Sequence, residues 1–219
     1  MNTQQPGLFD CMYSMRAMRR LKPDPVPPEM IDRILEAATQ APSGQNTQRW
    51  AFVVVTEEEG KQFFGERYRH WLYKLSGGRL PAEDDNSKGA RQMRAAVHLA
   101  DHMHEVPALI MACGKRDWPF VVAEEDRVGL APPSYGSIYP AVQNLLLACR
   151  GLGLGASLTT MHQMFESELH EFFGIPEDYG VVATIPIGFP LGRFGPVKRK
   201  PLAEVAHYEG WGRKRRDNA

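Results

Sequence analysis

The amino-acid sequence predicts an α+β fold in which layers of helices cover one central sheet. Residues 51–56 form an unbroken run of apolar and β-branched side chains, which is typical of a buried strand. Two further apolar runs, residues 106–113 and 180–189, are separated from it by stretches with helical periodicity. The sequence lacks the Asn-Gly or Asp-Gly turns that mark short hairpins. We therefore expect a three-layer arrangement, like that of α/β/α proteins, around a mixed or mostly antiparallel sheet.

Size and charge restrict the class of protein. The 219 residues suit a single domain, which we expect to span residues 1–219. The 26 basic residues balance 26 acidic ones, so the overall charge does not indicate a nucleic-acid partner. No apolar run has the length of a membrane span, and residues 1–7 lack the regions of a signal peptide. We expect a cytoplasmic protein with reduced, buried thiols at Cys11, Cys113 and Cys149.

The first half of the chain predicts two helices before the first strand. Apolar spacing indicates a helix over about residues 7–18, and four prolines between residues 23 and 28 then require an extended link. A second helix, over residues 29–40, has a regular apolar face and stops before Pro42. Its connection to the strand at residues 51–56 is rich in small hydrogen-bonding side chains.

After this strand, Thr56 and Glu59 have the spacing of a capping box and predict the start of a helix that reaches Leu75. This helix carries more aromatic side chains than a plain amphipathic helix needs, and a glycine-rich, charged loop follows it. We predict that residues 65–90 form a lid, with Tyr68, Trp71 and Tyr73 as its substrate-facing residues.

The rest of the chain also alternates between predicted helices and predicted strands. A helix over residues 87–104 precedes the strand at residues 106–113, and a helix over residues 137–150 ends at Gly151 and Gly153. A short strand at residues 156–159 and a helix at residues 165–173 precede the strand at residues 180–189. The apolar side chains of residues 190–219 follow neither the helical nor the strand period. The segment is too apolar to be simply disordered, so we predict an extended arm.

One motif changes the functional interpretation. Pro42, Ser43, Gly44, Asn46, Gln48 and Trp50 precede a buried strand. This pattern resembles the flavin-binding loop of the nitroreductase family, although Arg49 stands where the family usually has Pro. The resemblance covers about residues 13–205, and it implies an FMN-dependent oxidoreductase.

The resemblance also implies which residues hold FMN. Arg16 and Arg19 match the family's phosphate motif, with Ala17 where Ser is common, and Arg199 or Lys200 matches the basic residue before Pro-Leu. Leu158 would pack on the flavin ring, and the backbone of Thr159 or Thr160 would donate to N5. The expected FMN-binding residues are Arg16, Ala17, Arg19, Pro42, Ser43, Gly44, Asn46, Gln143, Leu158, Thr159, Thr160, Arg199 and Lys200.

The implied reaction uses NAD(P)H as a transient reductant of the flavin and then reduces a nitroaromatic, a quinone or another flat electrophile. No Gly-x-Gly-x-x-Gly motif joins a strand to a helix, so a Rossmann nicotinamide domain is not expected. The family resemblance further implies a homodimer that exchanges the arm, with the flavin at the interface.

Several alternatives stay open. A reductive dehalogenase of iodotyrosines is a related activity, but no Glu lies four residues before Tyr68 or Tyr73 as its lid motif requires. A flavin-binding storage or sensor protein without turnover would keep the same arginines. His98 and His102 have a spacing that can bind metal, but no third ligand is evident, so no metal is expected.

Overall fold

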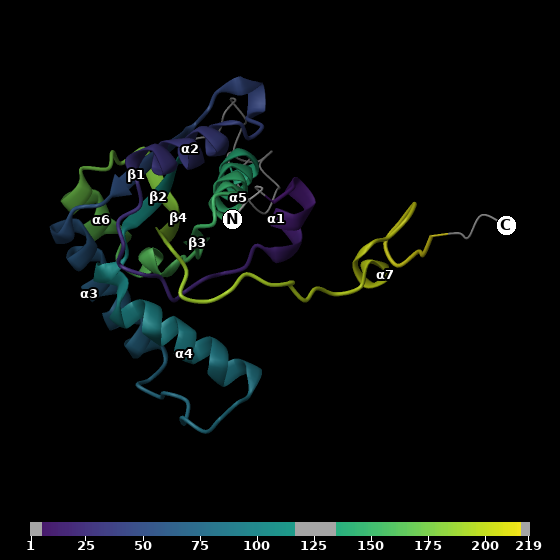
Figure 1. Cartoon of the computed structure of the whole chain (residues 1–219). Coiled ribbons are helices and arrows are strands. Elements are labelled where there is room, and N and C mark those ends of the chain that lie inside the picture. The colour runs from purple at the N-terminus through teal and green to yellow at the C-terminus, as the bar shows by residue number, and fades with distance from the viewer. Residues whose placement is uncertain (1–5, 117–134, 216–219) are drawn as a thin grey trace.

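The computed structural model describes residues 6–116 and 135–215. Within these residues, four strands form one sheet in the order β1-β2-β4-β3, and every neighbouring pair is antiparallel. The strands are β1 (Trp50–Val55), β2 (Ala108–Lys115), β3 (Gly155–Ala156) and β4 (Tyr179–Gly188). Strands that neighbour in the sheet are connected through helices and not through tight turns (Figure 1). The α+β prediction is confirmed.

The central strand β2 explains the layers of the fold. Its residues 108–114 are all buried, because helices cover both faces of the sheet. Successive side chains of a strand point to opposite faces. Ala108, Ile110 and Ala112 accordingly belong to one hydrophobic cluster, and Leu109, Met111 and Cys113 belong to another.

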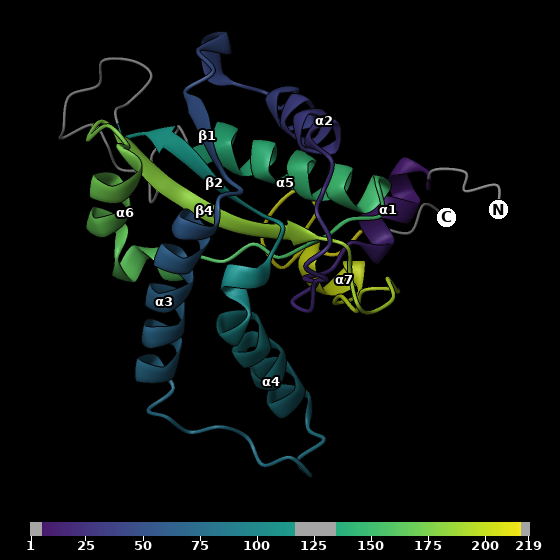
Figure 2. The same cartoon turned by 60° about the vertical axis from the view of Figure 1, so that its left-hand side comes forward.

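Helices α2 (Pro28–Thr39) and α5 (Tyr135–Gly151) cover the first face, where Ile34 and Leu145 are fully buried. Helices α3 (Glu58–Leu75) and α6 (Glu166–Phe173) cover the second, with Phe64 and Leu169 fully buried. The predicted ranges of α2, α3 and α6 are correct within about two residues. Figure 2 shows α2 and α5 on one side of the sheet, and α3 on the other.

Helix α4 (Lys88–Asp101) and helix α3 project together from the sheet (Figure 2). The loop between them is held at the start of α4, where Ser87 Oγ accepts a hydrogen bond from Ala90 N–H. Arg94 also donates to the loop carbonyls of Ala82 and Asp85, at 2.8 and 2.7 Å.

Three local predictions are wrong. Helix α1 (Leu8–Ser14) ends earlier than residue 18, because Met18 N–H donates to the carbonyl of Ala156 instead of continuing a helix. Helix α3 begins after Glu57 without a side-chain cap, so the predicted capping box of Thr56 does not form. Strand β3 is limited to two residues, and only an isolated bridge between Thr159 and Thr184 continues it.

The C-terminal arm begins along the body of the protein and then leaves it. Leu191 N–H donates to Arg20 O, and Val197 N–H donates to Tyr13 O, so residues 191–197 run beside residues 13–20. Beyond Val197 the chain extends outward to a short helix, α7 (Leu202–Val205), and Trp211 is 92% exposed (Figure 1). The arm is extended as predicted; its exchange in a dimer stays a prediction.

In the described ranges, no helix combines the length and apolar character that crossing a membrane requires.

Candidate functional site

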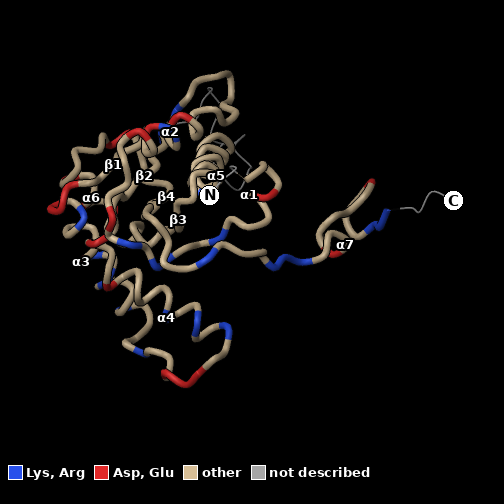
Figure 3. Tube along the Cα trace, in the orientation of Figure 1, with Lys and Arg blue, Asp and Glu red and all other residues tan. Residues whose placement is uncertain are grey.

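A cationic cavity of about 540 Å³ lies between residues 16–20, the first turns of α4 and the start of the arm. Arg16, Ala17 and Arg19, which the family resemblance assigns to FMN binding, line it together. Figure 3 shows Lys and Arg along the three segments that meet there. We call this site the cationic cavity; its charged lining residues are Arg16, Arg19, Arg20, Lys88, Arg91 and Arg193.

The charges of the cationic cavity are not neutralised by the described part of the chain. No carboxylate lines it, and none of its six cationic side chains forms an ion pair with the described residues. Like charges gathered in one hollow repel one another, and an anion relieves that repulsion. Guanidinium groups match phosphate in both charge and shape. The cavity is therefore suited to a phosphorylated ligand.

The wall formed by residues 16–20 is held by backbone pairing. Ala17 forms a parallel bridge with Ala156, and Met18 is buried. Close approach is possible because residue 155 is glycine. A Cβ on Gly155 would lie 2.8 Å from Leu21 Cδ2 and 3.0 Å from Met18 Cβ. The packing at Gly155 thus positions the arginines at the edge of the sheet.

The segment at residues 158–160 offers an apolar surface and a hydrogen-bond donor. Leu158 is 36% exposed, and Thr160 is exposed as well. The sequence left the N–H groups of Thr159 and Thr160 as alternative donors, and the structure distinguishes them. Thr159 N–H donates to Thr184 O at 2.9 Å, whereas Thr160 N–H has no acceptor among the described residues. Thr159 N–H is therefore already engaged within the sheet, and Thr160 N–H is not engaged by any described residue.

The Tyr68 side chain holds the segment at residues 158–160 through a hydrogen bond to Thr159. Thr159 Oγ1 donates to the Tyr68 hydroxyl at 3.3 Å, and Met161 N–H donates to Thr159 Oγ1 at 3.4 Å. Burial raises the pKa of Tyr68, while the bond to Thr159 and the charge of Arg19 partly oppose that rise. Tyr68 is only 5% exposed, so the expectation that it is a lid residue is wrong: it lies in the core under the sheet edge.

The two other predicted lid residues are half-buried on α3. Trp71 packs against the second hydrophobic cluster, and Lys74 Nζ lies 4.2 Å from its ring centroid. The Tyr73 hydroxyl lies 3.2 Å from each carboxylate oxygen of Asp101, which ties α3 to α4. Neither residue lines the cationic cavity, whose α4 wall is formed by Lys88, Arg91, Gln92 and Ala95.

The loop at residues 42–50 has a defined conformation. Ser43 Oγ accepts from Gln48 N–H at 2.8 Å, and Gly44 N–H donates to Ser137 Oγ at 3.3 Å. Gln45, Asn46 and Gln48 have φ angles of 53°, 53° and 48°. Such left-handed conformations cost energy in residues other than glycine and are concentrated at functional sites. The loop geometry agrees with a binding role.

The structure does not bring this loop to the cationic cavity within one chain. The loop contacts Ser137 at the start of α5, while Arg150 Nε donates to Ser14 Oγ near the other end. The 13 residues between them rise about 20 Å along the helix axis. Figures 1 and 2 both show the loop before β1 far from the segment after α1.

The other predicted FMN-binding residues lie outside the cationic cavity too. Gln143 is exposed about midway along α5. Arg199 and Lys200 are exposed on the projecting arm, where Arg199 donates to Lys198 O. Four further cations line the cavity that the sequence pattern did not predict: Arg20, Lys88, Arg91 and Arg193. The spacing of Lys88, Arg91 and Ala95 was the available signal, because it places them on one helix face.

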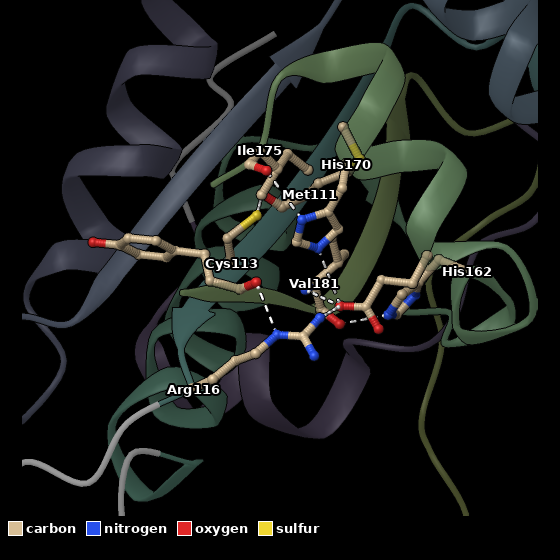
Figure 4. Close-up of polar contacts among 9 residues, drawn as sticks. Met111, Cys113, Arg116, His162, His170, Ile175 and Val181 are labelled. Carbon is tan, nitrogen blue, oxygen red and sulfur yellow. Dashed lines mark hydrogen bonds and ion pairs between the residues drawn. The ribbon is translucent and has the colours of Figure 1, made fainter. Parts of the chain in front are cut away.

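A second polar cluster, shown in Figure 4, joins β4 to the segment after Thr160. Glu166 Oε1 accepts from Val181 N–H at 2.9 Å and from Arg116 Nη2 at 2.8 Å. His162 Nε2 lies 2.7 Å from Val181 O. Burial is the main cause that lowers the pKa of His162, so its imidazole is held neutral. These contacts fix the 3-10 turn Met161–Met164 against the sheet.

The other candidate groups show no site. The rings of His98 and His102 are 4.3 Å apart, but no three His, Cys, Asp or Glu side chains among the described residues are placed to hold a metal. Cys11, Cys113 and Cys149 are buried and free, as expected. Burial raises the pKa of both the Cys113 and the Cys149 thiol to about 12.

The fold and this site define an α+β protein with a cluster of cationic side chains around a cavity at the edge of its sheet. The profile of the Nitroreductase family matches residues 13–189, and the chain belongs to that family. A Bacillus subtilis protein provisionally named NAD(P)H nitroreductase YfhC is 23% identical over 92% of this chain and 93% of its own. The iodotyrosine deiodinase of Thermotoga neapolitana is 27% identical over 84% of this chain and 88% of its own.

The similarity extends to solved structures. A nitroreductase of Desulfitobacterium hafniense, crystallised with bound FMN, has a TM-score of 0.67 and 18% identity, over 94% of this chain and all of that chain. This similarity supports the fold independently of the family profile.

Proposed function

We propose that this protein is an FMN-dependent oxidoreductase that uses NAD(P)H to reduce a flat electrophilic acceptor, such as a nitroaromatic or a quinone. The observation that carries the proposal is the cationic cavity, together with the Thr160 N–H, which has no acceptor among the described residues. A phosphorylated, flat heteroaromatic ligand needs both features. Membership of the nitroreductase family, a relative named for NAD(P)H and a neighbour bound to FMN give further support.

The residues present fit FMN. Arg16 and Arg19 lie on one wall of the cationic cavity and supply charge-assisted donors for the phosphate. Leu158 offers an apolar surface to a ring system. Thr160 N–H would be the donor for N5 of the ring. When bound, FMN accepts a hydride from NAD(P)H and passes two electrons to an acceptor.

The chain's own contribution is position and polarity. A donor fixed before the reaction stabilises developing charge without reorganisation. Thr160 is fixed in this way, because the bonds of Thr159 to Thr184 and Tyr68 hold the preceding residue. The side chains described around the cationic cavity include no carboxylic acid and no histidine, so we propose that water supplies the proton for the acceptor.

We further propose that the active unit is a cytoplasmic homodimer. The loop at residues 42–50 and the arginines at residues 16–19 are separated by about 20 Å along α5. A two-fold dimer would let the loop of one chain cover the arginines of the other. Apolar side chains that one chain leaves exposed would be buried in that interface; they include Phe9, Tyr13, Leu191, Leu202, Val205 and Trp211.

Reductive dehalogenation is the alternative activity, since the iodotyrosine deiodinase of Thermotoga neapolitana is 27% identical to this chain. The position of Tyr68 argues against it, because a buried tyrosine is not free to close over a substrate. Turnover of 3-iodo-L-tyrosine by the reduced protein would favour this alternative over nitro or quinone reduction.

The first experiment is to purify the protein and record its visible spectrum. Acid precipitation should release FMN, and the protein should oxidise NADPH or NADH with a quinone or a nitrofuran. A colourless protein that does not take up added FMN would contradict the proposal. Bound FMN without turnover of any acceptor would instead indicate a storage or sensor protein.

A further inference from the structure

We propose that Lys88 and Arg91 bind the 2′-phosphate of NADPH and make this protein select NADPH over NADH. The inference rests on the proposed function and names the reductant for that site. Both residues lie on the first turns of α4 and line the cationic cavity together with residues 16–20.

The number of charges exceeds what the flavin requires. A phosphate monoester carries about 1.5–2 negative charges at neutral pH. Arg16 and Arg19 supply two positive charges for it, which leaves Arg20, Lys88, Arg91 and Arg193. A neutral quinone or nitroaromatic would use none of these four, and a single carboxylate would need one. A second phosphorylated ligand would use them, and NADPH carries a pyrophosphate and a 2′-phosphate.

The geometry gives the cationic cavity two separate walls. Lys88 and Arg91 are three residues apart, so their side chains leave the same face of α4. Ala95, one turn further on that face, also lines the cavity and is too small to close it. The cavity volume of about 540 Å³ lies in the range of about 300–1,000 Å³ typical of sites for whole small molecules, so it is large for one phosphate group.

Arg94 shows that the cations of α4 have distinct roles. Its guanidinium is committed to the carbonyls of Ala82 and Asp85, and it does not line the cavity. Lys88 and Arg91 form no ion pair with any described residue, although Asp84 and Asp85 lie close in sequence. A surface used only for solubility would let these charges pair. The unpaired cations instead surround a hollow, which indicates a small anionic ligand.

The test compares ligands that differ only in the 2′-phosphate. Adenosine 2′,5′-bisphosphate and 5′-AMP are titrated by calorimetry into the FMN-loaded protein, and kcat/KM is measured for NADPH and NADH. We expect the bisphosphate to bind at least about tenfold more tightly than 5′-AMP, as charge-assisted hydrogen bonds to phosphate predict. In the Lys88→Gln, Arg91→Gln double variant, this ratio and the NADPH to NADH ratio should both fall by about tenfold or more.

Arg33→Gln is the matched control, because it removes an exposed arginine on α2 and should leave both ratios unchanged. Equal binding of the two nucleotides to the parent protein would overturn the inference. A double variant that releases FMN but keeps its preference for the 2′-phosphate would also overturn it, since Lys88 and Arg91 would then belong to the flavin phosphate site.

Failure of the proposed function gives a different result. A protein that neither binds FMN nor oxidises either nucleotide would refute the oxidoreductase proposal. A flavoprotein with equal kcat/KM for NADH and NADPH would refute only the role of Lys88 and Arg91. The calorimetric comparison needs no turnover, so in a protein that binds FMN it decides the inference even if no acceptor is reduced.

Discussion

Thr159 Oγ1 lies 3.3 Å from the hydroxyl oxygen of Tyr68, and this hydrogen bond connects helix α3 to the residue before the exposed N–H of Thr160. Tyr68 is part of the core and Thr160 is open to a ligand. The orientation of a backbone donor at the edge of the sheet therefore depends on a buried side chain from a helix about 90 residues earlier in the sequence.

Tyr68→Phe should change the properties of the bound flavin more than its affinity. The substitution removes the acceptor for Thr159 Oγ1 and should cost about 1 kcal/mol of stability. We expect a shifted flavin midpoint potential and visible spectrum, because Thr160 N–H is less firmly held. Tyr73→Phe also deletes a hydroxyl from α3, but that hydroxyl contacts Asp101, so it should leave the potential unchanged. Equal potentials in the two variants would contradict the role of Tyr68.

Arg16→Ala and Arg19→Ala should each weaken FMN binding by at least about tenfold, because each loses a charge-assisted hydrogen bond to the phosphate. Fluorescence quenching of added FMN measures the Kd. Arg33→Ala, a change of the same kind on the outer surface of α2, is the control. If FMN binds to both cavity variants as it does to the control, Arg16 and Arg19 do not hold its phosphate.

Much of the fold could be predicted from local pattern. The helix expected over residues 29–40 is Pro28–Thr39, and the apolar runs form the three long strands. The early end of α1 could not be predicted, because Met18 pairs with Ala156, which is remote in sequence.

In the candidate site too, local sequence predicted some residues, and those that depend on remote contacts could not be predicted. The resemblance identified Arg16 and Arg19, whose contribution depends on charge and residue type. The burial of Tyr68 and the hydrogen bonds of Thr159 could not be predicted, because they depend on how α3 and residue 184 pack around one turn. Lys88 and Arg91 were missed, since an amphipathic pattern shows that residues share a face but not what that face meets.

Gly155→Ala should destabilise the protein by about 1–3 kcal/mol, the usual cost of overpacking. The new Cβ would lie 2.8 Å from Leu21 Cδ2 and 3.2 Å from Pro190 Cβ, and residues 16–20 would have to move. FMN affinity should fall together with the urea midpoint. At Gly89, in the first turn of α4, an added Cβ meets no atom within 4 Å, so Gly89→Ala should not destabilise. A loss in the Gly89 variant as large as that at Gly155 would contradict the packing argument.

Stability should fall as the pH is lowered below about 6.5, the ordinary pKa of histidine. Burial lowers the pKa of His162 in the folded protein, so the unfolded state binds the proton first. The stability that this difference contributes is present above the unfolded pKa and is lost as the pH falls towards the folded one. Urea midpoints at pH 7.5, 6.5 and 5.5 measure the slope. His162→Gln keeps a donor for Val181 O and should flatten it, whereas His104→Gln, at an exposed position, should not. An unchanged slope in His162→Gln would rule out this origin.

Removal of residues 198–219 should weaken both self-association and FMN binding. This truncation keeps the bonds of Leu191 to Arg20 and of Val197 to Tyr13, so it deletes only the part of the arm that leaves the body. Sedimentation velocity at micromolar concentration compares it with the full chain. A truncated protein that still dimerises and retains FMN would show that the projecting arm neither joins the subunits nor completes the site.

The length of helix α5 has a genetic consequence. It keeps the Ser43 loop and the Arg16 segment about 20 Å apart on one chain. If each flavin is enclosed by a loop from one subunit and arginines from the other, two inactive alleles can rescue each other. A heterodimer of a loop mutant and an Arg16 mutant would contain one site with both defects and one with neither. Random mixing of the two inactive proteins would then restore about a quarter of full activity, whereas two different alleles affecting the same segment would restore none.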